Sequence, residues 1–286
     1  MNSRTKGIFH ILLAGLAFAF MGLFIRLSGD LPAIQKSFFR NLIAFAVTFS
    51  IFIKNGEKIQ IKKENYKFLI LRSTFGTIGI ICNFYALDHM VLSDASMLNK
   101  LSPFFVIIFS YFILKERITI FQGLMVLTAF LGAVFIVKPT GNISSFPAII
   151  AALGGMGAGA AYTMVRLLGK RGVEKKIIIM FFSGFSCIAS IPFMLGRFAP
   201  MSLNQLLLLI CAGIMATVGQ FAITKAYFYA PAKEISIYDY SQIIFSALIG
   251  FAFLQQIPDL HSVLGYVIIC FSAVSMYLYN SRHVEA

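Results

Sequence analysis

Polar and charged residues lie inside two long apolar stretches of the chain, where side chains have little access to water. Asn99 and Lys100 lie in the stretch 85–116, and Asp239 lies in the stretch 225–256. A charged side chain at membrane depth costs roughly 3 kcal/mol or more, and such residues mark solute or proton pathways. These residue types therefore favour binding of a polar solute over covalent chemistry.

The composition explains why such residues are unusual. Of the 286 residues, 59% are hydrophobic and 12% are charged, whereas a soluble domain carries about 25% charged residues. Apolar runs recur, each long enough to cross roughly 30 Å of hydrocarbon as a helix. A helix satisfies its own backbone hydrogen bonds, which lipid cannot do. We therefore expect an all-α integral membrane protein without a soluble domain.

Ten transmembrane helices are predicted, joined by short loops. Their approximate ranges are 8–27, 32–53, 67–87, 93–114, 119–138, 147–168, 174–195, 204–229, 233–254 and 260–279. An even number of spans puts both termini on one side of the membrane.

The lysines and arginines indicate which side that is. With the N-terminus inside, 16 of the 24 fall in inner segments, three fall at outer ends and five fall within spans. Inner segments carry the excess of positive charge in membrane proteins, so both termini are predicted to be cytoplasmic, in a multi-pass protein of the cytoplasmic membrane. Because short loops hold most of the net charge of +13, nucleic-acid binding is not expected. The four cysteines lack metal-binding spacing, and no metal or cofactor site is expected.

The two halves of the chain repeat one plan at an offset of 140 residues. Asp239 stands at the position of Asn99, and Arg166 stands at the position of Arg26. One register therefore holds near both ends of the half. Since each half contains five predicted spans, the second half must enter the membrane from the opposite face, which gives an inverted repeat.

Short motifs follow in a fixed order along the first half. They are Phe39-Arg40 in the second span, Tyr85-Ala86-Leu87 at the end of the third, and Pro103 with Lys115-Glu116 in the fourth. This order resembles the drug/metabolite transporter superfamily, EamA type. The second half departs from the pattern, with Gln256 and Ile243 where the family often has Glu and Pro. The resemblance implies two EamA-like halves, 1–142 and 143–286, of five helices each, around a central cavity.

Ten residues within the spans are candidates for contacts with a substrate. They are Arg40, Asn83, Asn99, Lys100, Tyr162, Gln220, Tyr227, Tyr238, Asp239 and Gln242. Three other cations, Lys36, Arg72 and Lys225, lie nearer the span ends, and we expect them to snorkel to the headgroups.

Helical rise gives each charged candidate a depth. At about 1.5 Å per residue, Arg40 lies ~12 Å and Lys100 ~10 Å from the outer face, and Asp239 lies ~10 Å from the inner face. Lys100 and Asp239 are therefore not expected to form a direct pair. Asp239, the only acid placed deep in a span, could carry a proton, meet a substrate amine, or pair statically with Lys225 or an arginine. Arg40 could equally donate to backbone carbonyls.

These features favour a secondary active transporter that moves a small polar metabolite by alternating access. Arg40 and Lys100, with no deep acid opposite them, favour an organic anion, and Asp239 extends this to an amino-acid-like zwitterion. The alternatives are a membrane-embedded lipid-modifying enzyme and, within transport, a drug or amine exporter. Expected partners are a small-molecule substrate, the lipid bilayer, and protons or a counter-substrate for coupling. The sequence does not decide between a monomer and a homodimer.

Overall fold

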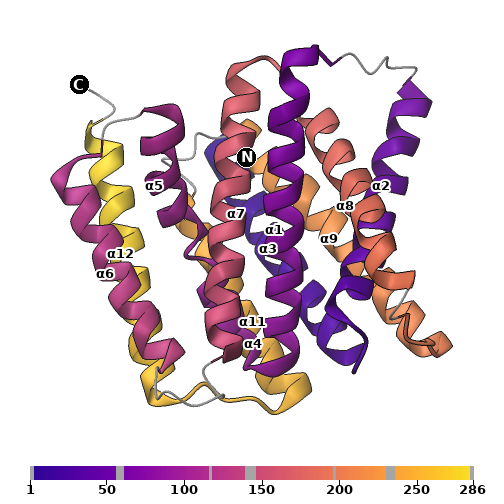
Figure 1. The fold of residues 1–286 in the computed structure, drawn as a ribbon. Helices are drawn as coiled ribbons and strands as arrows, with labels where there is room; N and C mark the ends of the chain where they lie inside the picture. The colour runs from indigo at the N-terminus through magenta and orange to yellow at the C-terminus, as the bar shows by residue number, and fades with distance from the viewer. Residues whose placement is uncertain are drawn as a thin grey trace.

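The computed structural model of the chain describes residues 3–55, 61–115, 118–138, 146–195, 198–229 and 236–283. These residues form a bundle of helices that run up and down in turn, and no strand occurs among them (Figure 1). Within this part of the chain, nine helices are long and apolar enough to cross a membrane, and a shorter apolar helix spans Tyr238–Leu254. The predicted all-α membrane fold of ten transmembrane helices is confirmed.

The elements follow the predicted spans closely. The first half contains α1 (Ser3–Leu27), α2 (Ala33–Asn55), the short η1 (Lys63–Asn65), α3 (Tyr66–His89), α4 (Leu92–Asn99), α5 (Ser102–Leu114) and α6 (Ile120–Val137). The second half contains α7 (Phe146–Lys170), α8 (Lys175–Leu195), α9 (Leu203–Tyr229), η3 (Ser236–Tyr240), α11 (Ser241–Leu254) and α12 (Leu260–His283).

The fourth span is interrupted, which the sequence did not predict. Lys100 and Leu101 separate α4 from α5, and Pro103 lies in the first turn of α5. Proline lacks the backbone N–H and clashes with the preceding turn, so it favours the start of a new helix. The matching span of the second half is also irregular, because the 3₁₀ helix η3 precedes α11 and contains Asp239 and Tyr240. Each half thus contributes one span with a break near its charged residue.

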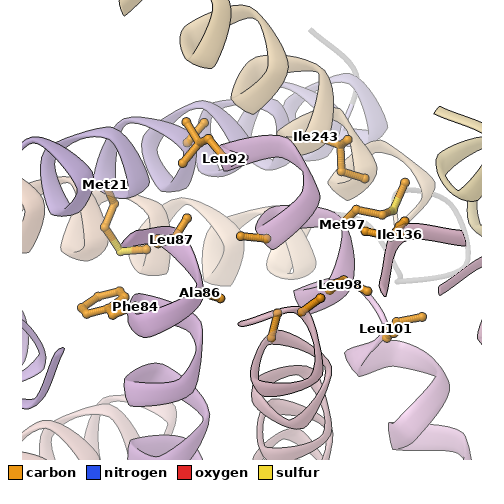
Figure 2. Packing of buried hydrophobic residues seen from close by; sticks show 14 of the residues in the cluster. Met21, Phe84, Ala86, Leu87, Leu92, Met97, Leu98, Leu101, Ile136 and Ile243 are labelled. Carbon is orange, nitrogen blue, oxygen red and sulfur yellow. The ribbon is translucent and has the colours of Figure 1, made fainter. Parts of the chain in front are cut away.

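Short α4 is held by its neighbours. An eight-residue helix is marginal by itself, but Leu92 and Leu98 of α4 are almost fully buried. Met21 of α1, Ile243 of α11 and Ile136 of α6 belong to the same apolar cluster (Figure 2). Packing from both halves therefore fixes the position of the break after α4.

The interrupted fourth span packs closely against glycines of α7. A Cβ atom on Gly155 would lie 2.7 Å from the carbonyl oxygen of Leu98, and one on Gly159 would lie 2.5 Å from the Cβ of Phe105. Small residues at such contacts let helix backbones approach closely. Helix α7 thereby places the end of α4 and the start of α5, and with them Lys100.

Large apolar side chains cover much of the bundle surface. Phe112, Ile120, Leu195 and Leu203 are all mostly exposed in the isolated chain. Exposed apolar surface on this scale would be unusual for a soluble protein, and it fits contact with lipid.

Candidate functional site

A cavity of about 550 Å³ lies where the two interrupted spans meet. Residues of both halves line it, from α1, α2, α3, α4, α5, α7, α8, α9, η3, α11 and α12. Eight of the ten candidates from the sequence are among them: Arg40, Asn83, Asn99, Lys100, Tyr162, Gln220, Asp239 and Gln242. A second hollow of about 350 Å³ lies near Pro32 and Phe146 and is lined mainly by apolar side chains, so it offers little to a polar solute.

The other two candidates lie elsewhere. Tyr238 packs against a small apolar cluster that contains Ile11 and Ala226, and it is not among the described residues that line the cavity. The side chain of Tyr227 lies outside the described part of the structure. Tyr240, which the sequence analysis did not select, does line the cavity, and its hydroxyl donates to the backbone oxygen of Lys100 at 3.3 Å.

Lys100 and Asp239 form an ion pair between the two halves, so the expectation that they stay apart was wrong. The Lys100 Nζ donates to Asp239 Oδ2 at 2.6 Å, and the two side chains are 10% and 17% exposed. The depth estimate assumed one rise per residue along unbroken helices. A 3₁₀ helix instead advances about 2.0 Å per residue, which places Asp239 deeper in the membrane, further from the inner face. The flexible side chain of Lys100 spans the remaining distance.

Arg40 and Arg72 are both buried in the cavity wall, with 8% and 7% of their surface exposed. Arg40 Nη1 donates to Asn41 Oδ1 at 2.6 Å. The guanidinium of Arg72 lies 3.6 Å from the ring centre of Phe182. The prediction that Arg72 snorkels to the headgroups was therefore wrong, because depth along the helix does not say which way a side chain turns. Gly76, one turn further along α3, is the sequence feature that could have indicated an inward face.

Lys36 also does not snorkel. It is fully buried near the start of α2, and its Nζ lies 2.6 Å from both carboxylate oxygens of Asp88 at the end of α3. This pair joins two helices of the same half, and neither residue is among the described residues that line the cavity. Lys225, the third cation in that group, is exposed.

A second buried acid, Asp94, lies at one end of the bundle, near the start of its span. Asp94 of α4 is 6% exposed. Its carboxylate accepts hydrogen bonds from the hydroxyl of Ser262 at 3.1 Å and from the hydroxyl of Tyr266, both on α12. Nearby, Ser96 of α4 and Ser246 of α11 share a hydrogen bond of 2.9 Å. We call this group the α4 closure, and the topology predicted from the loop charges puts it at the outer end of the bundle.

Comparison with known proteins shows the class of protein. The EamA-like transporter family matches the chain twice, over residues 5–138 and 147–278. A pseudopaline exporter of Pseudomonas aeruginosa is 30% identical over 279 residues, which cover 96% of this chain and 97% of the exporter.

More distant relatives are also transporters by name. Solute carrier family 35 member G1 of Mus musculus is 27% identical over 91% of this chain and 74% of its own length. A riboflavin transporter of Vibrio cholerae is 26% identical over 93% of this chain and 91% of its own length. A solved crystal structure shares the fold over 99% of both chains, with a TM-score of 0.66 at 16% identity. The chain belongs to the EamA-like transporter family of the drug/metabolite transporter superfamily, and it is a multi-pass membrane transporter rather than an enzyme.

Proposed function

We propose that this protein is a secondary active transporter that carries a small polar metabolite with an anionic group across the cytoplasmic membrane by alternating access. The observation that carries the proposal is the cavity between the halves, which places polar and charged side chains at the breaks in both interrupted spans. Breaks in membrane helices near the midplane supply polar groups to substrates in many transporters with inverted repeats.

The charges of the cavity favour an anion or a zwitterion. Of the described residues that line it, Arg40, Arg72 and Lys100 are cationic and Asp239 is anionic. Lys100 is paired with Asp239, whereas Arg40 and Arg72 have no acid partner among the described residues. A cation without a partner in a low dielectric is costly, and charge-assisted hydrogen bonds to a carboxylate or phosphate would relieve that cost. An ammonium group on the same substrate would find a partner in Asp239, whose Oδ1 is buried and accepts no hydrogen bond in the structure.

Alternating access would come from rocking of the half 1–142 against the half 143–286. The α4 closure hydrogen-bonds the first half to the second at one end of the cavity. With both termini in the cytoplasm, as the loop charges predict, this structure corresponds to a carrier closed toward the outside. The name of the P. aeruginosa relative adds export as the direction to test first.

Counterflow in liposomes tests the transport proposal. Purified protein in vesicles loaded with an unlabelled metabolite should accumulate the same labelled metabolite, and protein-free vesicles should not. The panel should include amino acids, dicarboxylates, phosphate esters and lipophilic cations. Accumulation of lipophilic cations alone would replace our proposal with a drug or amine exporter.

Two further measurements test the orientation and the coupling. Reporter fusions at Asn55 and Asn142 should report a cytoplasmic and an outer location respectively, and a cytoplasmic report from Asn142 would contradict the inversion. Transport with and without an imposed pH gradient distinguishes proton coupling from exchange against a counter-substrate. If protons are coupled, Asp239→Asn should abolish the pH dependence and leave exchange measurable.

A further inference from the structure

Two arginines from different helices face the same side of the cavity. Arg40 lies on α2 and Arg72 lies on α3, and both line the main cavity and a smaller hollow that adjoins it at Phe182 and Gln220. Both guanidinium groups therefore border the same hollow, where like charges repel one another. Folding keeps two like charges together only when something else stabilises the pair, and a shared anion would do so.

Both groups have hydrogen-bonding capacity that the protein leaves unused. The Nε atoms of Arg40 and Arg72, and Nη1 of Arg72, are buried without an acceptor. Among the described residues, the ion pairs engage other groups, and no carboxylate lies within 4.0 Å of either guanidinium. A buried donor left unsatisfied costs about 1–3 kcal/mol, and more when it is charged. The protein without substrate therefore carries the cost of these unsatisfied donors in the wall of the cavity.

Lys100 does not belong to this group. Its ammonium is engaged by Asp239 at 2.6 Å, so its charge is already balanced. The sequence suggested that Arg40 and Lys100 bind an anion, and the structure favours Arg40 and Arg72 in this role instead. The planar fork of arginine also suits a two-oxygen anion better than the point charge of lysine.

Gly76 and Phe182 hold Arg72 in position. The Phe182 ring lies 3.6 Å from the guanidinium carbon, a stacking distance. A Cβ atom on Gly76 would lie 2.9 Å from Cε2 of Phe182 and 3.0 Å from Nη1 of Arg72. Because Gly76 has no side chain, the guanidinium of Arg72 and the ring of Phe182 can lie directly against α3.

From this geometry we propose that Arg40 and Arg72 together bind one oxyanion group of the substrate, a carboxylate or a phosphate, and that Gly76 is a positioning residue for Arg72. The proposal rests on the transport function proposed above and names the part of the substrate that this wall of the cavity recognises. Any remaining part of the substrate then faces Asp239, Asn83 and the other side chains that line the cavity.

Thermal-shift titrations of the full chain in detergent test the proposal. The probes are L-glutamate and succinate for carboxylates, glycerol 3-phosphate and inorganic phosphate for phosphates, and tetraphenylphosphonium as a lipophilic cation. A ligand that binds the folded state raises the melting temperature by mass action. We expect stabilisation of the wild type by one of the two anion classes, and the class that acts identifies the group.

The variants are Arg40→Gln, Arg72→Gln and Gly76→Ala, with Lys225→Gln as the matched loss of one exposed cation. Loss of two charge-assisted hydrogen bonds should weaken anion binding roughly tenfold or more. Gly76→Ala keeps every charge, so weaker binding in this variant separates positioning from net charge. Arg72→Lys serves where Arg72→Gln does not fold, and it should also bind roughly tenfold more weakly because the fork is lost.

Each result decides between the claims. Equal anion affinity in the arginine variants and the wild type overturns the subsite, while counterflow still stands as evidence of transport. Stabilisation of the wild type by no anionic probe also overturns it. Equal weakening in Lys225→Gln would reduce the effect to general attraction of anions by a basic protein. If Gly76→Ala binds normally while the arginine variants do not, the positioning role alone is wrong.

Discussion

The ion pair between Lys100 and Asp239 offers a quantitative test of the structure. The two atoms lie 2.6 Å apart, and the side chains are mostly buried between the halves. Removing one partner leaves the other charge uncompensated, which costs ~3–5 kcal/mol for a buried pair. Because this pair borders a cavity that can admit water, we expect the lower limit, about 3 kcal/mol, for Asp239→Asn or for Lys100→Met.

Melting temperatures in detergent measure this loss. A destabilisation of 1 kcal/mol lowers the melting temperature by roughly 2–4 °C for chains of 150–250 residues, so each single variant should melt roughly 6–12 °C below the wild type. The double variant, Lys100→Met with Asp239→Asn, buries no charge there. It should regain more than half of the loss, which gives a favourable coupling of the two residues in a double-mutant cycle.

The exposed pair between Lys138 and Asp259 is the matched control. Surface pairs contribute about 0–1 kcal/mol, so Lys138→Met should melt close to the wild type. Two results would refute the reasoning for Lys100 and Asp239: single variants that melt within about 2 °C of the wild type, or a double variant whose loss equals the sum of the two single losses.

Three further predictions concern the closure, the packing of α7 and the outer surface. Asp94→Asn should weaken the α4 closure, because hydrogen bonds to a charged acceptor contribute about 1.5–3 kcal/mol each. A cysteine placed within the α4 closure should then react roughly tenfold faster with a membrane-impermeant thiol reagent in this variant than in the wild type. An unchanged rate of labelling would count against this role of Asp94. Gly159→Ala should lower the melting temperature through an overpacking cost of about 1–3 kcal/mol, since its Cβ would lie 2.5 Å from another side chain. In Gly123→Ala of α6 the new Cβ meets nothing within 4 Å, and loss of glycine flexibility should stabilise by ~0.5–1 kcal/mol; a shift of the same sign in both variants would contradict the packing argument. The hydrogen bond from Lys138 lowers the pKa of Asp259, which lies outside the spans, to about 2. The contribution of the Asp259 carboxylate to the stability of the folded protein is therefore complete above its ordinary pKa near ~3.9, and it is lost only as the pH falls through about 2. The difference in melting temperature between Asp259→Asn and the wild type should stay constant from about pH 5 to 8.

The number and type of the helices could be predicted from the sequence because they depend on local composition. Each apolar run is long enough to cross the membrane, and a helix is the structure that satisfies its backbone in lipid. The break at Lys100 could not be predicted in this way, because the apolar pattern continues on both sides of it. Pro103 pointed to a helix start, but proline is also tolerated within membrane helices when neighbours satisfy the freed groups. Only the packing of α4 between both halves decides the matter.

The candidate site was predictable in its residues and not in their pairing. Depth within a span selected Arg40 and Lys100, which line the cavity. The same criterion set Arg72 aside, because depth carries no information on the direction of a long side chain. It also kept Lys100 and Asp239 apart, because it assumed unbroken helices of constant rise. Contacts between spans that are distant in sequence depend on tertiary packing, which span lengths do not contain.

The repeat register, more than depth, explains why candidate residues from both halves line one cavity. Lys100 and Tyr240 occupy equivalent positions 140 residues apart, and in the structure the hydroxyl of Tyr240 donates to the backbone oxygen of Lys100. Two equivalent residues of an inverted repeat can touch only near the pseudo-two-fold axis. Polar residues at those positions, such as Asn99 and Asp239, must therefore come close to the same central cavity from either half.

The symmetry of the backbone does not extend to the charges at the axis. The repeat equivalent of the Lys100–Asp239 pair joins Asn99 to Tyr240, which carry no formal charge. Rocking of the halves therefore cannot exchange this ion pair for an equivalent one on the other side. Contacts near the axis move least in a rigid-body rotation, whereas contacts at the ends, such as the α4 closure, move most. In the proposed cycle, the ion pair is thus able to persist as a pivot while the hydrogen bonds of Asp94 break to open the cavity to the outside.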